Sequence, residues 1–406
     1  MSGSHRRVDC GEHAPLPVLA VGAGAMGRAW LRTLQASPEV ELVGIVDLDT
    51  DAAGRAAAEL GRPDLPIGTD AVTLAARTGA AAVVDVTVPV AHHPVTTAAL
   101  LAGLPVLGEK PAADTLPRAL SLAAAAEVSG ELFMVSQSRR WNPQVAALRG
   151  LVQDLGAVGT LTTEFFRAPR FGGFRDAMAQ PLLVDMAIHA FDTARYLLGA
   201  EPVSAWCSSW NPSWSWYAGD ANATALFTMA DGSRFSYTGS WCAPGAETSW
   251  NGAWRVSAER GTARWDGETE PVLDAEGLVA TDRPRSPHSD IGGALEVFCA
   301  ALRTGETPMG EVHENVLSLA MVEAAVESAA TGRPVQLDDL LARAHVQALA
   351  EEAHPGVRAA LGGWSSVREA LAAGAGWVRP VGDRRIRADS GSCGSSSPAD
   401  SACGSS

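Results

Sequence analysis

The pattern of apolar positions changes near residue 139, and this change divides the chain into two regions. From residue 16 to 137, short runs of branched apolar residues alternate with stretches of helical pattern. Strands that alternate with helices imply right-handed crossovers and a parallel sheet. The first region therefore predicts a doubly wound α/β domain. Its expected strands are 18–21, 42–46, 82–88, 105–107 and 132–135, and its expected helices are 28–36, 49–60, 74–78, 94–102 and 116–129.

Beyond residue 139 the strand-like runs follow one another, with turn signals such as Asp231-Gly232 and Arg260-Gly261 between neighbours. Consecutive strands joined by short turns pair antiparallel. The second region therefore predicts an α+β domain built on a large, open, mostly antiparallel sheet. Its expected strands are 160–167, 203–210, 221–229, 234–241, 254–258 and 262–265, and its expected helices are 145–155, 181–198, 291–304 and 314–331.

A glycine pattern joins the first expected strand to the first helix. Gly22, Gly24 and Gly27 have the spacing G-x-G-x-x-G. The first glycine permits a tight turn, the second lets a pyrophosphate approach the backbone, and the third allows the helix to pack closely on the strand. Asp47 ends the next apolar run, where a carboxylate can bind the ribose hydroxyls of a dinucleotide. These features together predict a nucleotide site; a purely structural turn is the alternative.

The residue at position 47 also bears on the choice of cofactor. A carboxylate there repels the additional phosphate of NADP, and Leu48 rather than an arginine follows it. NAD is therefore favoured over NADP. With this site included, the chain predicts a flexible leader over 1–15, an NAD-binding Rossmann domain over 16–137, an α+β substrate and oligomerisation domain over 138–340, a helical extension over 341–389 and a disordered Ser/Gly-rich tail over 390–406.

Composition narrows the class of partner. The 406 residues carry a formal net charge of −15, which argues against nucleic acid or an anionic membrane as a partner. Six scattered cysteines form no C-x-x-C pair and no zinc spacing, so no metal site is expected and a reducing, cytoplasmic compartment is favoured. No apolar run is long enough to span a bilayer.

Two groups of residues could carry chemistry. Lys110 follows the expected strand 105–107, and ligands of doubly wound sheets bind beyond the carboxyl ends of strands. Asp185, His189 and Asp192 have the spacing i, i+4, i+7 and would share one face of an otherwise apolar helix. Asp185 could orient His189 for proton exchange with a hydroxyl. The alternatives are a surface lysine, and a helix ion pair or a histidine satisfied in the core.

Four motifs in this order resemble the Gfo/Idh/MocA family of NAD(P)-dependent oxidoreductases, which act largely on sugars and cyclitols. They are the glycine pattern, Pro89 with His93, Glu109-Lys110-Pro111, and Asp185-x-x-x-His189-x-x-Asp192. The resemblance covers about 16 to 338. It implies that Lys110 lies beside the nicotinamide and the substrate, and that Asp185 and His189 complete the acid–base group. Ala187 stands where the family often has glycine, and the segment after Leu340 has no recognised counterpart.

Further contacts are expected around this centre. Pro89 and His93 would shape the loop beneath the nicotinamide, with a helix-cap role for His93 as the alternative. Arg140 could bind substrate oxygens or form an inter-domain salt bridge. Most tryptophans fall in the second region, where they fill a core or an oligomer interface or line a sugar pocket; Trp241 is the best candidate to face the substrate. The expected cofactor-binding set is Gly22, Gly24, Ala25, Met26, Gly27, Asp47, Val88, Pro89, His93, Glu109 and Lys110, and the expected substrate-binding set is Lys110, Arg140, Asp185, His189 and Trp241.

One loop before the expected helix 181–198 also has the character of a substrate cover. Phe171-Gly172-Gly173-Phe174-Arg175 places two glycines between aromatic residues, which is typical of a mobile loop. Arg175 and its neighbours could contact a substrate or stay solvated.

The sequence therefore predicts an NAD-dependent oxidoreductase acting on a secondary hydroxyl or carbonyl of a sugar, cyclitol or related polyol. The alternatives are NAD-dependent glycoside hydrolysis through transient oxidation, and a non-catalytic sensor of NAD or sugar. The tryptophan-rich sheet of the second domain favours a homodimer or homotetramer.

Overall fold

We describe a computed structural model of the chain that covers residues 5, 6, 8, 14–281 and 289–374. The expected tail, residues 375–389 of the expected extension and most of the expected leader lie outside these residues. Two described positions of the leader are tied to the rest of the protein. The backbone N–H groups of Arg6 and Val8 donate to the carbonyls of Gly130, at 2.9 Å, and Leu302, at 3.1 Å.

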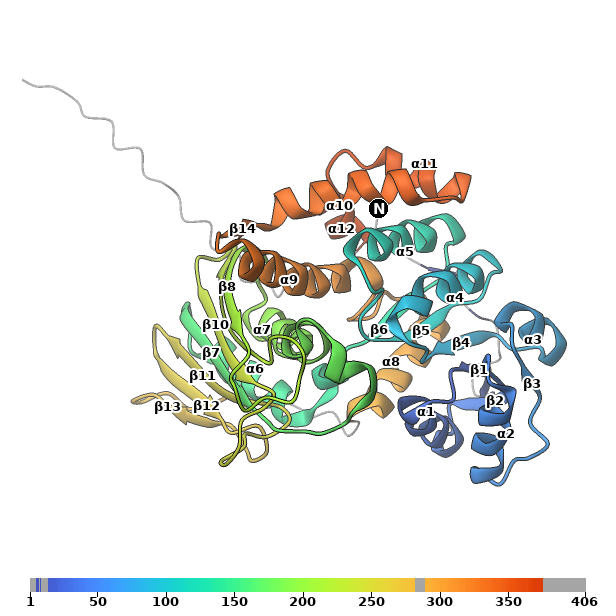
Figure 1. Cartoon of the computed structure of the whole chain (residues 1–406), viewed down its shortest axis with the longest axis horizontal. Helices are drawn as coiled ribbons and strands as arrows, with labels where there is room; N and C mark the ends of the chain where they lie inside the picture. The colour runs from blue at the N-terminus through green and yellow to red at the C-terminus, as the bar shows by residue number, and fades with distance from the viewer. Residues whose placement is uncertain (1–4, 7, 9–13, 282–288, 375–406) are drawn as a thin grey trace, which may run out of the picture.

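The first domain is a doubly wound parallel sheet of six strands in the order β3-β2-β1-β4-β5-β6, with helices on both faces (Figure 1). This confirms the predicted Rossmann architecture. The strand expected over 82–88 ends at Asp85, because the Asp85 carboxylate accepts hydrogen bonds from the Thr87 backbone N–H and hydroxyl and turns the chain into the next helix. The strands are β1 (Leu16–Val21), β2 (Val40–Val46), β3 (Ile67–Gly68), β4 (Ala82–Asp85), β5 (Val106–Glu109) and β6 (Phe133–Ser136); the helices are α1 (Ala25–Ala36), α2 (Thr50–Glu59), α3 (Ala71–Thr78), α4 (Pro89–Leu101) and α5 (Leu116–Ser129).

The second domain is built on an eight-stranded sheet in the order β13-β12-β11-β7-β10-β9-β8-β14. Its neighbours pair antiparallel except β7 and β10, which run parallel, so the sheet is mostly antiparallel as predicted. The strands are β7 (Val158–Phe166), β8 (Pro202–Trp210), β9 (Asn222–Met229), β10 (Arg234–Ser240), β11 (Ala253–Ala258), β12 (Gly261–Trp265), β13 (Val272–Asp274) and β14 (Val335–Gln336); the helices are α6 (Pro143–Asp154), α7 (Ile188–Leu198) and α9 (Val312–Thr331). The helix expected over 291–304 is α8 (Asp290–Thr304), and it packs on the first sheet instead, because Leu295 and Phe298 are buried in one apolar cluster with Val18 of β1.

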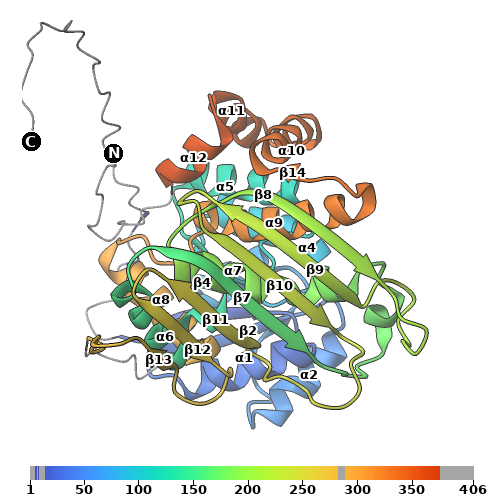
Figure 2. The ribbon, with the colours of Figure 1, turned by 90° about the vertical axis from the view of Figure 1, so that its left-hand side faces the viewer.

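One face of this sheet packs against helices, and no helix of the described residues covers the other (Figure 2). Alternation along the strands produces this difference, since successive side chains of a strand point to opposite faces. In β9, Ala225 and Phe227 are fully buried, whereas Leu226 between them is 43% exposed. Trp206, which pairs with Leu226 on β8, is 41% exposed on the same open face.

The extension forms three helices, α10 (Leu337–Glu351), α11 (Pro355–Gly363) and α12 (Val367–Gly374), which lie along α5 and α9 (Figure 1). Polar contacts fix them to α5. The Ser121 hydroxyl donates to the Glu352 carboxylate, and the Trp364 indole donates to Glu127 at 3.1 Å. The extension therefore braces the first domain against α9.

Candidate active site

The turn between β1 and α1 requires its glycines. Gly22 has φ = 101°, and a Cβ atom there would lie 2.5 Å from the carbonyl oxygen of Val86. A Cβ at Gly27 would lie 2.1 Å from the carbonyl oxygen of Gly22, so only glycine allows the helix to approach the turn. A Cβ at Gly24 would meet nothing within 4 Å. The open side of the turn is thus at Gly24, the N-cap of α1, which lines the cleft together with the first turn of that helix, and a helix N-terminus favours an anion such as a pyrophosphate.

Asp47 lies beside this turn at the carboxyl end of β2. Its Oδ2 atom accepts the Ala23 N–H at 2.7 Å, and its Oδ1 atom accepts the Asp49 N–H at 2.8 Å. Both hydrogen bonds hold the carboxylate at the edge of the glycine turn, while the following Leu48 is 89% exposed. A carboxylate in this place suits the ribose hydroxyls of NAD, so the residues present fit that cofactor.

The glycine turn opens into a cleft of about 1970 Å³ between the two domains. The cleft brings together residues from both halves of the chain. The expected site residues that line it are Gly22, Gly24, Ala25, Met26, Gly27, Asp47, Val88, Pro89, Glu109, Lys110, Asp185 and His189.

Lys110 and Asp185 meet inside this cleft. The Lys110 Nζ atom lies 2.9 Å from the backbone carbonyl oxygen of Asp185 and 3.2 Å from its Oδ1 atom. Arg175 takes the other carboxylate oxygen, with its Nε atom 2.5 Å from Oδ2. Burial would raise the pKa of Asp185, but Lys110 and Arg175 together hold it below its usual value. Asp185 is therefore an anion shared by two cations.

His189 lies in the same cleft but does not pair with Asp185 in the described structure. The expected geometry was wrong here, because Leu182–Ala187 forms a π-helical turn rather than α-helix and the Asp185 carboxylate is directed to Lys110 and Arg175. The His189 Nδ1 atom is buried without a hydrogen-bond partner. Burial, with the positive charges of Arg139 and Lys110, lowers the pKa of His189 well below its usual value. The imidazole is thus neutral at pH 7.

Glu109 lines the cleft next to Lys110 and contacts its backbone. Its Oε1 atom accepts the Trp30 indole N–H at 2.7 Å, and its Oε2 atom accepts the Lys110 backbone N–H at 3.2 Å. Burial raises the pKa of Glu109, although these hydrogen bonds and the Lys110 charge oppose the shift. Glu109 therefore fixes the backbone that aims the lysine.

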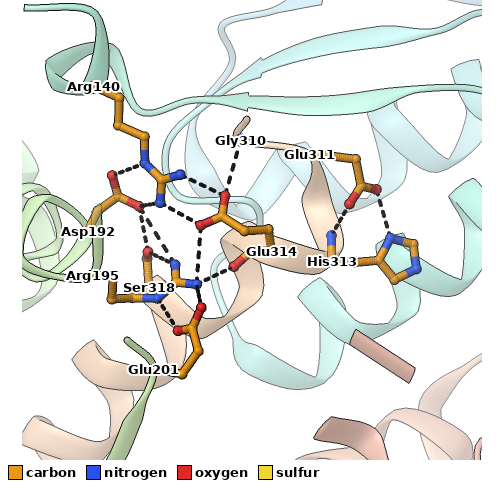
Figure 3. A network of polar contacts seen from close by, with 9 residues as sticks. All are labelled: Arg140, Asp192, Arg195, Glu201, Gly310, Glu311, His313, Glu314 and Ser318. Atoms are coloured by element: carbon orange, nitrogen blue, oxygen red, sulfur yellow. Dashed lines mark hydrogen bonds and ion pairs between the residues drawn. The ribbon is translucent and has the colours of Figure 1, made fainter. Parts of the chain in front are cut away.

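Arg140 does not line the cleft, which corrects its assignment as a substrate ligand. Its side chain is 1% exposed and lies in a buried ion-pair network (Figure 3). The guanidinium donates to both Asp192 oxygens, at 2.7 and 2.6 Å, and to both Glu314 oxygens, at 2.8 and 2.7 Å. A guanidinium has five N–H donors. Those of Arg140 either donate to carboxylates or are enclosed by protein, so none is available to a substrate. The salt-bridge alternative for Arg140 is the one that the structure shows.

The same network contains Asp192, the third member of the expected polar stripe. Ser318 and Arg140 both donate to its Oδ1 atom. Arg195, which is equally buried, pairs with Glu201 and Glu314. Burial would raise the pKa of Glu314, but Arg140 and Arg195 hold it below its usual value. The network joins the segment after β6 to α7 and α9, and so fixes the helix that carries His189 (Figure 3).

Two further expected ligands also face elsewhere. The His93 Nε2 atom lies 3.0 Å from the Ser121 hydroxyl, so His93 joins α4 to α5 instead of reaching the cofactor. Trp241 is 1% exposed, and its ring stacks on Tyr217 with 5.9 Å between ring centroids. The indole therefore belongs to the core. Trp250 lines the cleft in its place.

Arg139 and Trp250 were not among the expected site residues, yet both line the cleft, and so does Arg175, for which substrate contact was one of two expectations. The Arg139 guanidinium donates to the Trp250 carbonyl. Phe171 stacks on Trp250 with centroids 6.1 Å apart, which places the glycine-containing loop over this side of the site. Adjacent arginines of identical type gave no sign that Arg139 would face the cleft and Arg140 the core.

The fold and the site together define a dinucleotide-binding oxidoreductase, and comparisons with known proteins agree. Residues 16–137 match the model of an oxidoreductase family with an NAD-binding Rossmann fold, and residues 145–264 match the Gfo/Idh/MocA C-terminal domain. The chain belongs to the Gfo/Idh/MocA family of oxidoreductases, as its motifs predicted.

Individual relatives extend over most of the chain. The protein y4oX of Sinorhizobium fredii is 31% identical over 80% of this chain and 96% of its own length. An inositol 2-dehydrogenase of Rubrobacter xylanophilus is 27% identical over 81% of this chain and 95% of its own length. Among solved structures, GenD2 from gentamicin A biosynthesis, in complex with NAD, is 26% identical, covers 81% of this chain and 99% of its own, and has a TM-score of 0.66. Within the described residues, no helix has the length and apolar character needed to cross a membrane.

Proposed function

We propose that the protein is an NAD-dependent dehydrogenase that acts on a secondary hydroxyl or carbonyl of a sugar, cyclitol or related polyol. One observation carries this proposal. Lys110 from the first domain and His189 from the second line the same cleft as the glycine turn. Named dehydrogenases among the relatives, for inositol and for D-apiose, support the substrate class.

His189 acts as the proton acceptor. Because its pKa is held low, the imidazole is neutral at pH 7 and can take a proton from a substrate hydroxyl. The cost of leaving its Nδ1 atom buried without a partner is consistent with a group kept for chemistry rather than for stability. NAD, when bound, supplies the acceptor for the hydride that leaves the same carbon.

Lys110 holds the reacting oxygen. Its ammonium group can donate a hydrogen bond to a substrate hydroxyl and stabilise the negative charge that develops as the proton leaves. Asp185 keeps the ammonium in place through two contacts, one from its carbonyl and one from its carboxylate. Asp185 thus positions Lys110, whereas the sequence suggested that it positions His189. The reverse reaction uses the same groups.

The test is NADH formation by the purified protein across a panel of cyclitols, aldoses and polyols, with NAD and NADP compared on each. We expect turnover with at least one polyol and a preference for NAD. Product without net NADH would instead favour glycoside cleavage through transient oxidation. Binding of NAD or sugar with no turnover of any kind would overturn the proposal in favour of a sensor.

We further propose that the protein forms a homodimer or homotetramer through the open face of the eight-stranded sheet, and that it is cytoplasmic. Trp206 and Leu226 lie exposed side by side on that face. Light scattering after size exclusion should give a mass of two or four chains, and Leu226→Glu should reduce it. A wild-type protein that stays monomeric at micromolar concentration would contradict this assembly.

A further inference from the structure

The two neighbouring arginines after β6 have opposite electrostatic environments. Arg140 is surrounded by two carboxylates in the core. Arg139 lines the cleft, and in the described structure its one hydrogen bond goes to the Trp250 carbonyl, a neutral acceptor. No carboxylate of the described residues lies within ion-pair distance of Arg139. The Arg139 side chain is half-buried, and among its guanidinium groups only Nη2 has a hydrogen-bond acceptor within the described residues.

The charges around Arg139 leave an excess of positive charge at the reaction centre. Lys110, Arg139 and Arg175 all line this part of the cleft. Among the carboxylates of the cleft, Asp185 is already shared by Lys110 and Arg175, and Glu109 accepts the backbone N–H of Lys110. Asp290 also lines the cleft and acts on Arg139 from a distance, without forming an ion pair. A chain with a net charge of −15 has thus placed a cation that has no ion-pair partner among the described residues near its candidate general base.

Burial makes the unpaired guanidinium of Arg139 unfavourable in free energy when no ligand is bound. Burial lowers the pKa of Arg139 to about 10, and the guanidinium in turn lowers the pKa of His189. A planar guanidinium with two parallel N–H donors matches a carboxylate in shape and charge, and such pairs are stronger than hydrogen bonds between neutral groups.

We propose that the substrate of this enzyme carries a carboxylate, bound by Arg139, in addition to the carbinol on which Lys110 and His189 act. The substrate class is therefore a sugar acid or another polyol acid. This inference rests on the proposed dehydrogenase function and deepens it. Arg139 is the residue that selects the acid over the neutral sugar.

Matched substrate pairs test the inference: glucuronate against glucose, and galacturonate against galactose, each assayed by NADH formation. The wild-type protein should prefer an acid to its neutral partner, and Arg139→Gln should collapse that preference by roughly 10- to 100-fold, the loss expected for hydrogen bonds to a charged group. Arg139→Lys should retain part of it. Arg264→Gln removes a guanidinium that is exposed on strand β12. This variant controls for bulk charge and should leave the preference unchanged.

A binding measurement keeps the result independent of turnover. Titration of each acid into the enzyme–NADH complex forms no product, because oxidation needs the oxidised cofactor. We expect binding by the wild-type protein, weakened in Arg139→Gln, with NADH affinity of the variant showing that it is folded. Neutral sugars that turn over as well as their acids, or an equal loss for both members of a pair, would overturn the carboxylate while leaving the dehydrogenase intact. No turnover of any polyol would instead count against the dehydrogenase itself.

Discussion

The Nζ atom of Lys110 lies 2.9 Å from the carbonyl oxygen of Asp185, a residue 75 positions later in the chain. This contact joins the end of a parallel strand in the first domain to a π-helical turn in the second. It places the lysine beside His189 and within the cleft that the glycine turn opens. The proposed chemistry depends on this juxtaposition.

The low pKa of His189 predicts that the acid limb of the pH profile of kcat/KM lies at unusually low pH. The neutral imidazole is the base, so kcat/KM for oxidation falls only as pH drops through its pKa, which lies well below 6.5. Between pH 6 and 8 its protonation should cause no loss of activity. Arg139→Gln removes one of the cations that depress this pKa, so the limb should move to higher pH. A wild-type limb centred at or above pH 6.5 would contradict this role for His189.

Arg140 should matter for stability rather than for substrate affinity. Arg140→Met removes four hydrogen bonds from the buried carboxylates of Asp192 and Glu314 and leaves them with Arg195 as their cation, and removing one partner of a buried pair costs about 3–5 kcal/mol. Urea unfolding measures this loss, with Arg255→Met as the control, since the Arg255 side chain is exposed on strand β11. A variant of normal stability with a raised KM would return Arg140 to the substrate site.

His313 predicts a pH dependence of stability. Burial would lower its pKa, but Glu311 at 2.7 Å and Glu127 at 3.1 Å raise it to about 10. The protonated imidazole therefore stabilises the folded chain fully below pH 6.5, and this contribution disappears as pH rises toward 10. Thermal unfolding should show a Tm that falls across this window. His313→Gln should be less stable at pH 6 and should flatten the profile; an unchanged slope in the variant would assign the dependence to other groups.

Asp47 should determine the choice between nicotinamide cofactors. Its carboxylate lies beside the glycine turn, where it would repel the additional phosphate of NADP. Asp47→Ser should shift the ratio of kcat/KM for NAD over NADP toward NADP by at least about tenfold, since removing a like-charge contact is worth more than 1.4 kcal/mol. Asp49→Ser, two residues further on at the N-cap of α2, controls for loss of an exposed carboxylate. A wild-type preference for NADP would refute the assignment.

Local patterns were enough to predict the first domain and the glycine turn, because strand, glycine spacing and helix all lie within a few residues. The helix predicted over residues 116–129 is α5, which begins and ends at the same residues in the structure. The parallel pairing of β7 with β10 could not be read from neighbouring turns, since it joins strands separated by two others in the chain.

The site was harder to predict, because side-chain direction depends on packing. A π-helical turn altered the relation of Asp185 to His189 that α-helical spacing implied. Carboxylates on α7 and α9 drew Arg140 into the core and left Arg139 to the cleft. Ser121 on α5 donates a hydrogen bond to Glu352 of the extension, and His93 on α4 contacts the same Ser121 hydroxyl instead of the cofactor site. Each outcome depends on residues more than 40 positions away, which no local pattern records.

The most direct measurement of the central claim is the turnover of Lys110→Ala with NAD and the best polyol found for the wild-type protein. If Lys110 holds the reacting oxygen beside His189, turnover should fall by roughly 10²–10⁴ while NAD binding and thermal stability stay close to those of the wild type. A folded variant that binds NAD and loses less than about tenfold in turnover would contradict the account.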